Sequence, residues 1–174
     1  MKKLKIYYMN REAFRNIFIY VTILTLQIFI FNHINLFEII TPYIYIVIFI
    51  LYKTSYDKTL LLLLGFLTGI IIDLSIQTYG CHTFASITIC YLRTKIEKTS
   101  FGVNANLPLA MVKGTKFSSR AFFFLILIFI HSITYYSLIF FNVNAIVEIF
   151  SYTIINSIIT FMIVWVISKL ISNK

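Results

Sequence analysis

Two stretches of this chain, residues 121–141 and 145–167, are apolar over enough length to cross a membrane. A helix needs about 20 apolar residues to cross the roughly 30 Å hydrocarbon core of a bilayer. The composition of the whole chain agrees, because 60% of its 174 residues are hydrophobic and only 12% are charged. Soluble domains carry about 25% charged residues. The sequence therefore predicts an integral membrane protein with one domain over residues 1–174, and it excludes a cytosolic enzyme, a disordered tail and a secreted disulfide scaffold.

We expect an all-α fold, a bundle of six transmembrane helices, because six apolar segments follow one another along the chain. They cover residues 16–31, 39–52, 59–76, 81–92, 121–141 and 145–167. The second and fourth segments are short for a complete helical crossing. Full crossing, tilting and a re-entrant course are all open for these two.

The basic residues indicate how many segments cross, because Lys and Arg in short loops stay on the cytoplasmic side of a membrane. If all six segments cross, the two tails share one side with the second and fourth loops. Those four stretches contain all fifteen Lys and Arg residues, and the other three loops contain none. The partition predicts that both termini are cytoplasmic. Merging two adjacent segments into one crossing would place basic loops outside.

The longest stretch outside the predicted spans is a basic cytoplasmic loop over residues 93–120. It is either an ordinary positive-inside loop, which is the preferred interpretation, or a surface for anionic lipid headgroups. The net charge of +9 does not indicate a nucleic-acid partner, because the chain has no room for a solvated basic patch on a folded domain. Cys81 and Cys90 lie in one apolar segment and are interpreted as small buried hydrophobic residues.

The third segment carries Gly65, Gly69 and Asp73 at intervals of four residues, which places them on one face of a helix. The two glycines predict close packing against another helix. Asp73 is the only carboxylate in this run. It is either a capping or pairing group near the outer surface, which is the preferred interpretation, or a proton or ligand site.

Two histidines add to this set of candidate residues. His82 follows Gly80 at the start of the fourth segment, where a hydrogen bond to Asp73 is geometrically reasonable. His131 lies halfway along the fifth segment, where it either makes one interhelical hydrogen bond, which is the preferred interpretation, or is a buried ligand. No catalytic arrangement, HExxH sequence or phosphate-binding loop occurs, so we expect no catalytic residue, no metal site and no cofactor.

Several short motifs resemble those of one family. Residues 32–37 (Asn-His-Ile-Asn-Leu-Phe) and 41–45 (Thr-Pro-Tyr-Ile-Tyr) are followed by the Gly65, Gly69 and Asp73 motif, then by residues 80–86 (Gly-Cys-His-Thr-Phe-Ala-Ser) and by Tyr-Leu-Arg ending at Arg93. Together these resemble MreD, the rod shape-determining membrane protein family, in the form found in Bacteroidetes-type bacteria. The resemblance covers about residues 16–140, and His131 lies where that form often carries a histidine.

The resemblance implies a non-enzymatic scaffold subunit of the cell-elongation complex in the bacterial inner membrane. The implied partners are an MreC-like membrane protein and, indirectly, an MreB-like filament and the peptidoglycan synthases. It also implies a bundle similar to the substrate-binding subunits of energy-coupling-factor transporters. The alternative function is therefore a vitamin-binding transporter subunit, in which an outer polar set would line the pocket: Asn32, His33, Asp73 and His82.

Overall fold

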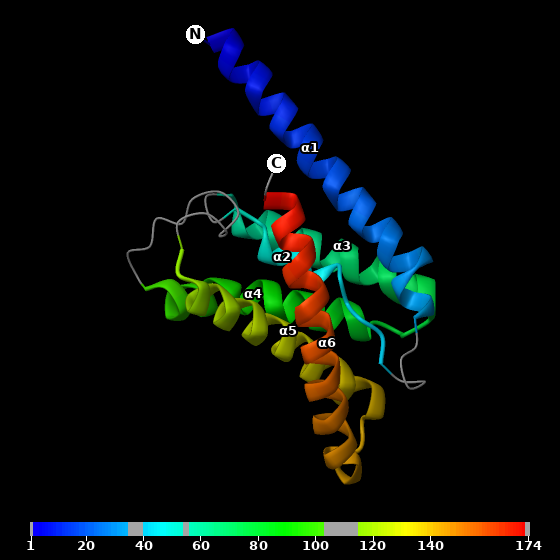
Figure 1. The fold of residues 1–174 in the computed structure, drawn as a ribbon. Coiled ribbons are helices and arrows are strands. Elements are labelled where there is room, and N and C mark those ends of the chain that lie inside the picture. Colours follow the sequence, from blue (N-terminus) through cyan, green and yellow to red (C-terminus); the bar gives the residue numbers. More distant parts are fainter. Residues whose placement is uncertain (1, 35–39, 54–55, 103–114, 173–174) are drawn as a thin grey trace.

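The computed structural model describes residues 2–34, 40–53, 56–102 and 115–172, and these residues are helical or connecting, with no β-strand among them (Figure 1). The long helices are α1 (Lys2–Phe29), α3 (Lys58–Ile76), α4 (Cys81–Phe101), α5 (Phe117–Phe140) and α6 (Ile146–Ser172). The short ones are η1 (Phe31–His33), α2 (Ile46–Ile50) and η2 (Val143–Ala145).

Four helical stretches are long and apolar enough to cross a membrane: Phe14–His33, Lys58–Ile76, Phe117–Phe140 and Val143–Ile171. They correspond to the first, third, fifth and sixth predicted segments. The described part of the protein is therefore all-helical, and four of its helices are suited to crossing a membrane. The second and fourth segments differ from the prediction.

The second segment, predicted at residues 39–52, does not form a long helix. Over its described residues, 40–52, the only helix is α2, with five residues, and the chain from Ile40 to Tyr45 is not helical. Pro42 has no N–H and disfavours helix in the residue before it, which explains why no long helix forms here. The side chains from Tyr43 to Val47 and those of Phe49 and Ile50 are at most 2% exposed, so this segment lies in the hydrophobic core, together with buried residues of the long helices.

The fourth segment continues as helix nine residues beyond its predicted end at 92. α4 runs to Phe101 and ends at Gly102, whose φ of +89° favours glycine. The residues predicted as the start of the basic loop 93–120 are therefore helical, because charge ends an apolar run without ending a helix. α5 begins at Phe117, and most of the remaining loop, residues 103–114, lies outside the described residues.

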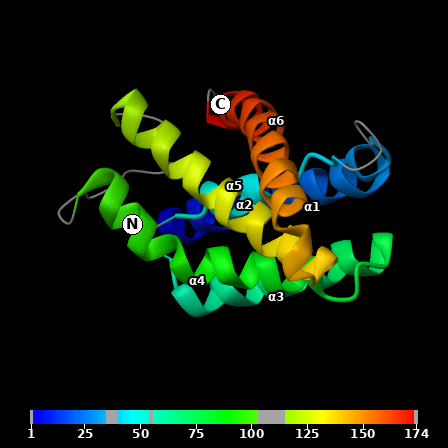
Figure 2. The same cartoon turned by 90° about the horizontal axis from the view of Figure 1, so that it is seen from below.

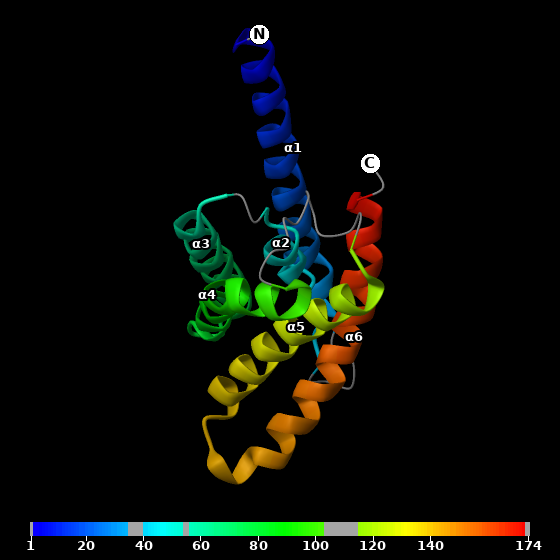
Figure 3. The same ribbon diagram turned by 90° about the vertical axis from the view of Figure 1, so that its left-hand side faces the viewer.

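The helices pack in chain order, α3 on α4, α4 on α5 and α5 on α6. Seen from below, α3 and α4 run alongside each other and α5 crosses them (Figure 2). α5 and α6 form a hairpin, and the N-terminal half of α1 extends away from the other helices (Figure 3). α2 contacts α5 and α6, so the second segment packs against these two helices.

Gly65 and Gly69 allow α3 to approach α4 closely. A Cβ atom at Gly69 would lie 2.3 Å from the Cα of Thr83, and one at Gly65 would lie 2.8 Å from the Sγ of Cys90. Both glycines thus face the packed side of α3, as the four-residue spacing predicts.

Candidate functional site

Asp73 binds the start of the next helix. One carboxylate oxygen accepts from the backbone N–H of His82 at 3.0 Å, and the other accepts from the backbone N–H of Thr83 at 2.8 Å and from its hydroxyl at 2.6 Å. The hydroxyl of Thr78 also donates to Asp73. The first N–H groups of a helix have no partner inside the helix, and a carboxylate there also interacts favourably with the helix dipole. Asp73 therefore caps α4 from the neighbouring helix.

The turn between α3 and α4 makes this contact possible. Gln77 ends α3 with a φ of +57°, and Gly80 precedes α4 with a φ of +93°. Gly80 supplies no side chain to cap α4, so the acceptor must come from elsewhere. Tyr79 also has a positive φ, of +50°, and these three left-handed residues turn the chain back within one short connection, which brings the start of α4 onto Asp73.

Tyr45, in the second segment, connects the two buried histidines. Its hydroxyl lies 2.9 Å from Nδ1 of His82 and 2.6 Å from Nε2 of His131. All three side chains are completely buried. The ring of Tyr135 stacks on His82 with a centroid separation of 4.3 Å, and Tyr43 meets both imidazoles at 5.1 and 5.2 Å. The site is thus a buried group with aromatic walls, formed where the non-helical part of the second segment meets α4 and α5.

Side chains from distant helices bind the backbone of the second segment where it is not helical. Gln27 of α1 donates to the carbonyl of Pro42 at 3.1 Å and accepts from the N–H of Tyr45 at 3.3 Å. Thr160 of α6 accepts from the N–H of Tyr43 at 3.2 Å. Non-helical backbone is tolerated at membrane depth only where protein surrounds and satisfies it.

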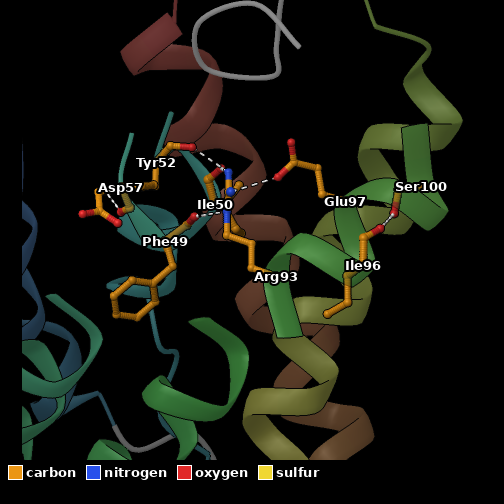
Figure 4. Close-up of polar contacts among 8 residues, drawn as sticks. All are labelled: Phe49, Ile50, Tyr52, Asp57, Arg93, Ile96, Glu97 and Ser100. Carbon is orange, nitrogen blue, oxygen red and sulfur yellow. Dashed lines mark hydrogen bonds and ion pairs between the residues drawn. The ribbon is translucent and has the colours of Figure 1, made fainter. Parts of the chain in front are cut away.

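Arg93 binds the other end of this segment. Its guanidinium donates to the carbonyls of Phe49 at 2.8 Å and Tyr52 at 2.6 Å, with a longer contact of 3.5 Å to Ile50, and it pairs with Glu97 at 2.9 Å (Figure 4). The last carbonyls of a helix receive no hydrogen bond from inside the helix. Those at the end of α2 therefore need donors from elsewhere. The planar guanidinium provides several donors at once.

The structure brings most predicted site residues into one connected set. Asp73, Gly80 and His82 meet at the α3–α4 turn, and His131 joins them through Tyr45. Arg93 lies three turns further along α4, as the numbering of this regular helix requires. The hydrogen bond between Asp73 and His82 uses the backbone N–H, not the imidazole.

Three of the four residues in the outer polar set predicted for a transporter pocket, Asn32, Asp73 and His82, bind other parts of the chain. Asn32 bonds to Gln27 at 2.8 Å and to Ser75 at 3.0 Å. Asp73 is 7% exposed and His82 is buried, while His33 is exposed. These residues act within the fold, so a role for Asp73 or His82 as a group presented to a partner does not fit their burial.

Sequence reasoning missed Tyr45, Gln27 and Thr160. Tyr45 lies in the motif at residues 41–45, but only the fold shows that it joins two histidines. Gln27 could have been recognised from its position near the end of an apolar helix, because a buried amide requires hydrogen-bond partners.

The fold and the site together define a membrane-type helical protein that is built around a buried, non-helical segment held by polar side chains. Comparisons with known protein families, with curated proteins and with solved structures find no match.

Proposed function

We propose that the chain crosses the bacterial inner membrane six times, with both termini in the cytoplasm. The second segment then crosses in a partly extended form. An extended chain covers about 3.3 Å per residue and a helix 1.5 Å, so a short, largely non-helical segment spans as far as a longer helix.

The contacts of the second segment with α4 support this course. Its Tyr45 lies beside His82 near the start of α4, and its Phe49 and Tyr52 lie beside Arg93. From His82 to Arg93, α4 rises by about 16 Å. The segment from Tyr45 to Tyr52 therefore runs alongside the first half of α4. In Figure 1 the beginning of α1 and the end of α6 lie towards the top, whereas the α5–α6 connection, which has no Lys or Arg, lies at the bottom.

Within this topology, the proposed function is that of a scaffold subunit of the cell-elongation complex, which supports cell shape and lateral peptidoglycan synthesis. One observation carries this proposal: the residues of the motifs that resemble MreD bind other parts of the same chain. Asp73, His82 and Arg93 are buried and bind the chain's own backbone or side chains. Residues used in this way hold helices in place, which is the requirement of a scaffold that presents its outer surface to partners.

The proposed partner is an MreC-like membrane protein, and the experiment is its co-purification. The tagged chain is solubilised in mild detergent from its native host, and the membrane proteins that accompany it are identified by mass spectrometry. We expect an MreC-like protein in near-stoichiometric amount, and we expect rounded cells when the chain is depleted.

A double variant separates the scaffold from an enzyme or a transporter. Asp73→Ala with His82→Ala should retain partial shape support in proportion to the amount of folded protein. Purified, reconstituted chain should show no turnover and no vitamin uptake. Uptake or turnover that the double variant abolishes, at equal folded yield, would require the proposal to be replaced.

A further inference from the structure

Trp165, the only tryptophan of the chain, has two cations over its ring. The guanidinium carbon of Arg120, on α5, lies 5.6 Å from the ring centroid, and Nζ of Lys169, on α6, lies 5.8 Å from it. A positive charge over the face of an indole is favourable. The ring therefore gathers one cation from each helix, where the start of α5 meets the last turns of α6.

Three phenylalanine rings hold the indole in this position. Phe117 and Phe124 of α5 meet it edge-on at centroid separations of 5.1 and 5.4 Å, and Phe161, one turn earlier on α6, lies at 5.5 Å. The side chain of Trp165 is nevertheless partly exposed. The indole is thus fixed between two helices while part of it remains open to the surroundings.

The two helices supply no carboxylate near these cations. α5 contains no Asp or Glu, and the only acidic residue of α6, Glu148, lies in its first turn, at the opposite end of the helix. The exposed Lys116, one turn before Arg120, adds a third positive charge. Like charges held beside one ring repel each other, and an anion placed between them replaces this repulsion with attraction. The charges at this place therefore favour an anionic ligand.

Apolar surface adjoins the cations on α6. Met162 and Val166 precede Trp165 and Lys169 by three residues, so each lies beside one of them on the surface of the helix. Both side chains are exposed. In a membrane such a surface contacts acyl chains, whereas a soluble anion would leave it uncovered. Tryptophan, lysine and arginine near the end of a span lie at the level of the lipid headgroups.

We propose that Arg120, Lys169 and Trp165 form a binding site for the headgroup phosphate of an anionic phospholipid, whose acyl chains lie along Met162 and Val166. In the proposed topology this site is on the cytoplasmic side, where basic pockets between transmembrane helices bind anionic headgroups. Of the basic stretch 93–120, which the sequence left open as a lipid surface, the site uses only the last residue. The site goes beyond the scaffold function and does not depend on it.

The test measures which lipid lies against Trp165. The purified chain is reconstituted into vesicles of equal parts phosphatidylglycerol and phosphatidylcholine, and in each sample one of the two lipids carries bromine on its acyl chains. Bromine quenches the fluorescence of a tryptophan that it contacts, and the chain has no second tryptophan to obscure the signal. One basic residue near an anionic membrane surface corresponds to about a fivefold preference. We therefore expect brominated phosphatidylglycerol to be preferred at least about fivefold, and equal quenching by the two lipids would overturn the proposal.

Variants of the two cations locate the preference. Lys169→Gln should reduce it several-fold, and Arg120→Gln combined with Lys169→Gln should abolish it. Arg120→Lys combined with Lys169→Arg keeps both charges and should keep most of the preference, which separates loss of charge from a change in packing. The double Gln variant refutes the site if it retains the preference, and so does the charge-keeping variant if it loses as much as the double Gln variant.

Lys95→Gln is the matched control. Lys95 is an exposed cation of α4 that lies over no aromatic ring among the described residues, and the proposed topology places it on the same side of the membrane. Its replacement removes the same charge from the chain and should leave the preference unchanged. A loss equal to that in Lys169→Gln would show that the overall charge of the chain attracts the lipid, and the site would be refuted.

A soluble phosphate ester separates a lipid from a free anion. Glycerol phosphate at millimolar concentration shares the headgroup chemistry but has no acyl chains. At constant ionic strength it should leave the preference for brominated phosphatidylglycerol unchanged, because the acyl chains keep the lipid against α6. A preference that falls as glycerol phosphate is added overturns the assignment to a lipid.

Discussion

Removal of the Asp73 carboxylate should destabilise the protein in two graded steps. Asp73→Asn retains one oxygen, which still accepts from the N–H of His82, but its amide nitrogen then faces the N–H of Thr83. The hydroxyl of Thr83 can rotate to accept, so one buried N–H loses its partner. Such a group costs about 1–3 kcal/mol. Asp73→Ala leaves both N–H groups without the carboxylate, so the expected loss is about 2–5 kcal/mol.

The assay is equilibrium unfolding of the purified chain in mixed detergent micelles, followed by helical circular dichroism and by the fluorescence of Trp165, the only tryptophan. Leu74→Ala is the control, because Leu74 is the next residue on α3 and is 77% exposed. It should change the free energy of unfolding by less than about 0.5 kcal/mol. The reasoning fails if Asp73→Ala unfolds at the same free energy as Leu74→Ala, or if Asp73→Asn is the more damaging of the two.

Three other outcomes are expected. Gly69→Ala should lower the free energy of unfolding by about 1–3 kcal/mol and Gly65→Ala by less, because the first Cβ meets backbone and the second meets a side chain that can rotate; equal losses in unfolding titrations would contradict this. Arg93→Lys should destabilise the protein, because a compact ammonium group cannot reproduce the fork of guanidinium bonds to the carbonyls of the second segment, and Arg93→Met should destabilise it more, because it also removes the charge that pairs with the buried Glu97; thermal melting that ranks Lys with the wild type, or Met with Lys, would argue against this role. In a background without the native cysteines, a cysteine at exposed Tyr79 should react with reagent from outside the cell and one at exposed Tyr56 only from the cytoplasm, and the reverse labelling would exclude the proposed topology.

The sequence predicted those parts of the fold that depend on local pattern. The long apolar runs indicated the helices that became α1, α3, α5 and α6, and the spacing of Gly65 and Gly69 indicated the close side of α3. The capping interpretation of Asp73 followed from its position near the end of a helix, and the structure shows four hydrogen bonds to its carboxylate. Local patterns are informative here because helix periodicity and side-chain spacing act over one or two turns.

The course of the second segment was beyond such reasoning. Its apolar composition is typical of a buried strand or helix alike, and periodicity does not distinguish them. What holds it is a set of bonds across long sequence separations, such as that from Arg93 to Phe49 over 44 residues. Nothing near residue 49 in the sequence indicates that an arginine on another helix will bind its carbonyl. The end of α4 was predicted too early, because hydropathy falls at Arg93 although the helix continues to Phe101.

The enclosed second segment also imposes an order on biosynthesis. It leaves the ribosome before α4 and α6 have been made, yet Thr160, which binds the N–H of Tyr43, lies 117 residues later in the chain. Gln27 of the earlier helix α1 is already available for the carbonyl of Pro42 and the N–H of Tyr45, but until Thr160 is made the N–H of Tyr43 lacks this partner. In hydrocarbon an unsatisfied backbone group costs several kcal/mol. If the second segment crosses the membrane as proposed, it has to wait in contact with water or with the insertion machinery while the rest of the chain is synthesised. Release from the translocon would then depend on completion of the C-terminal helix, and we expect a chain truncated before α6 to remain a substrate for membrane quality control.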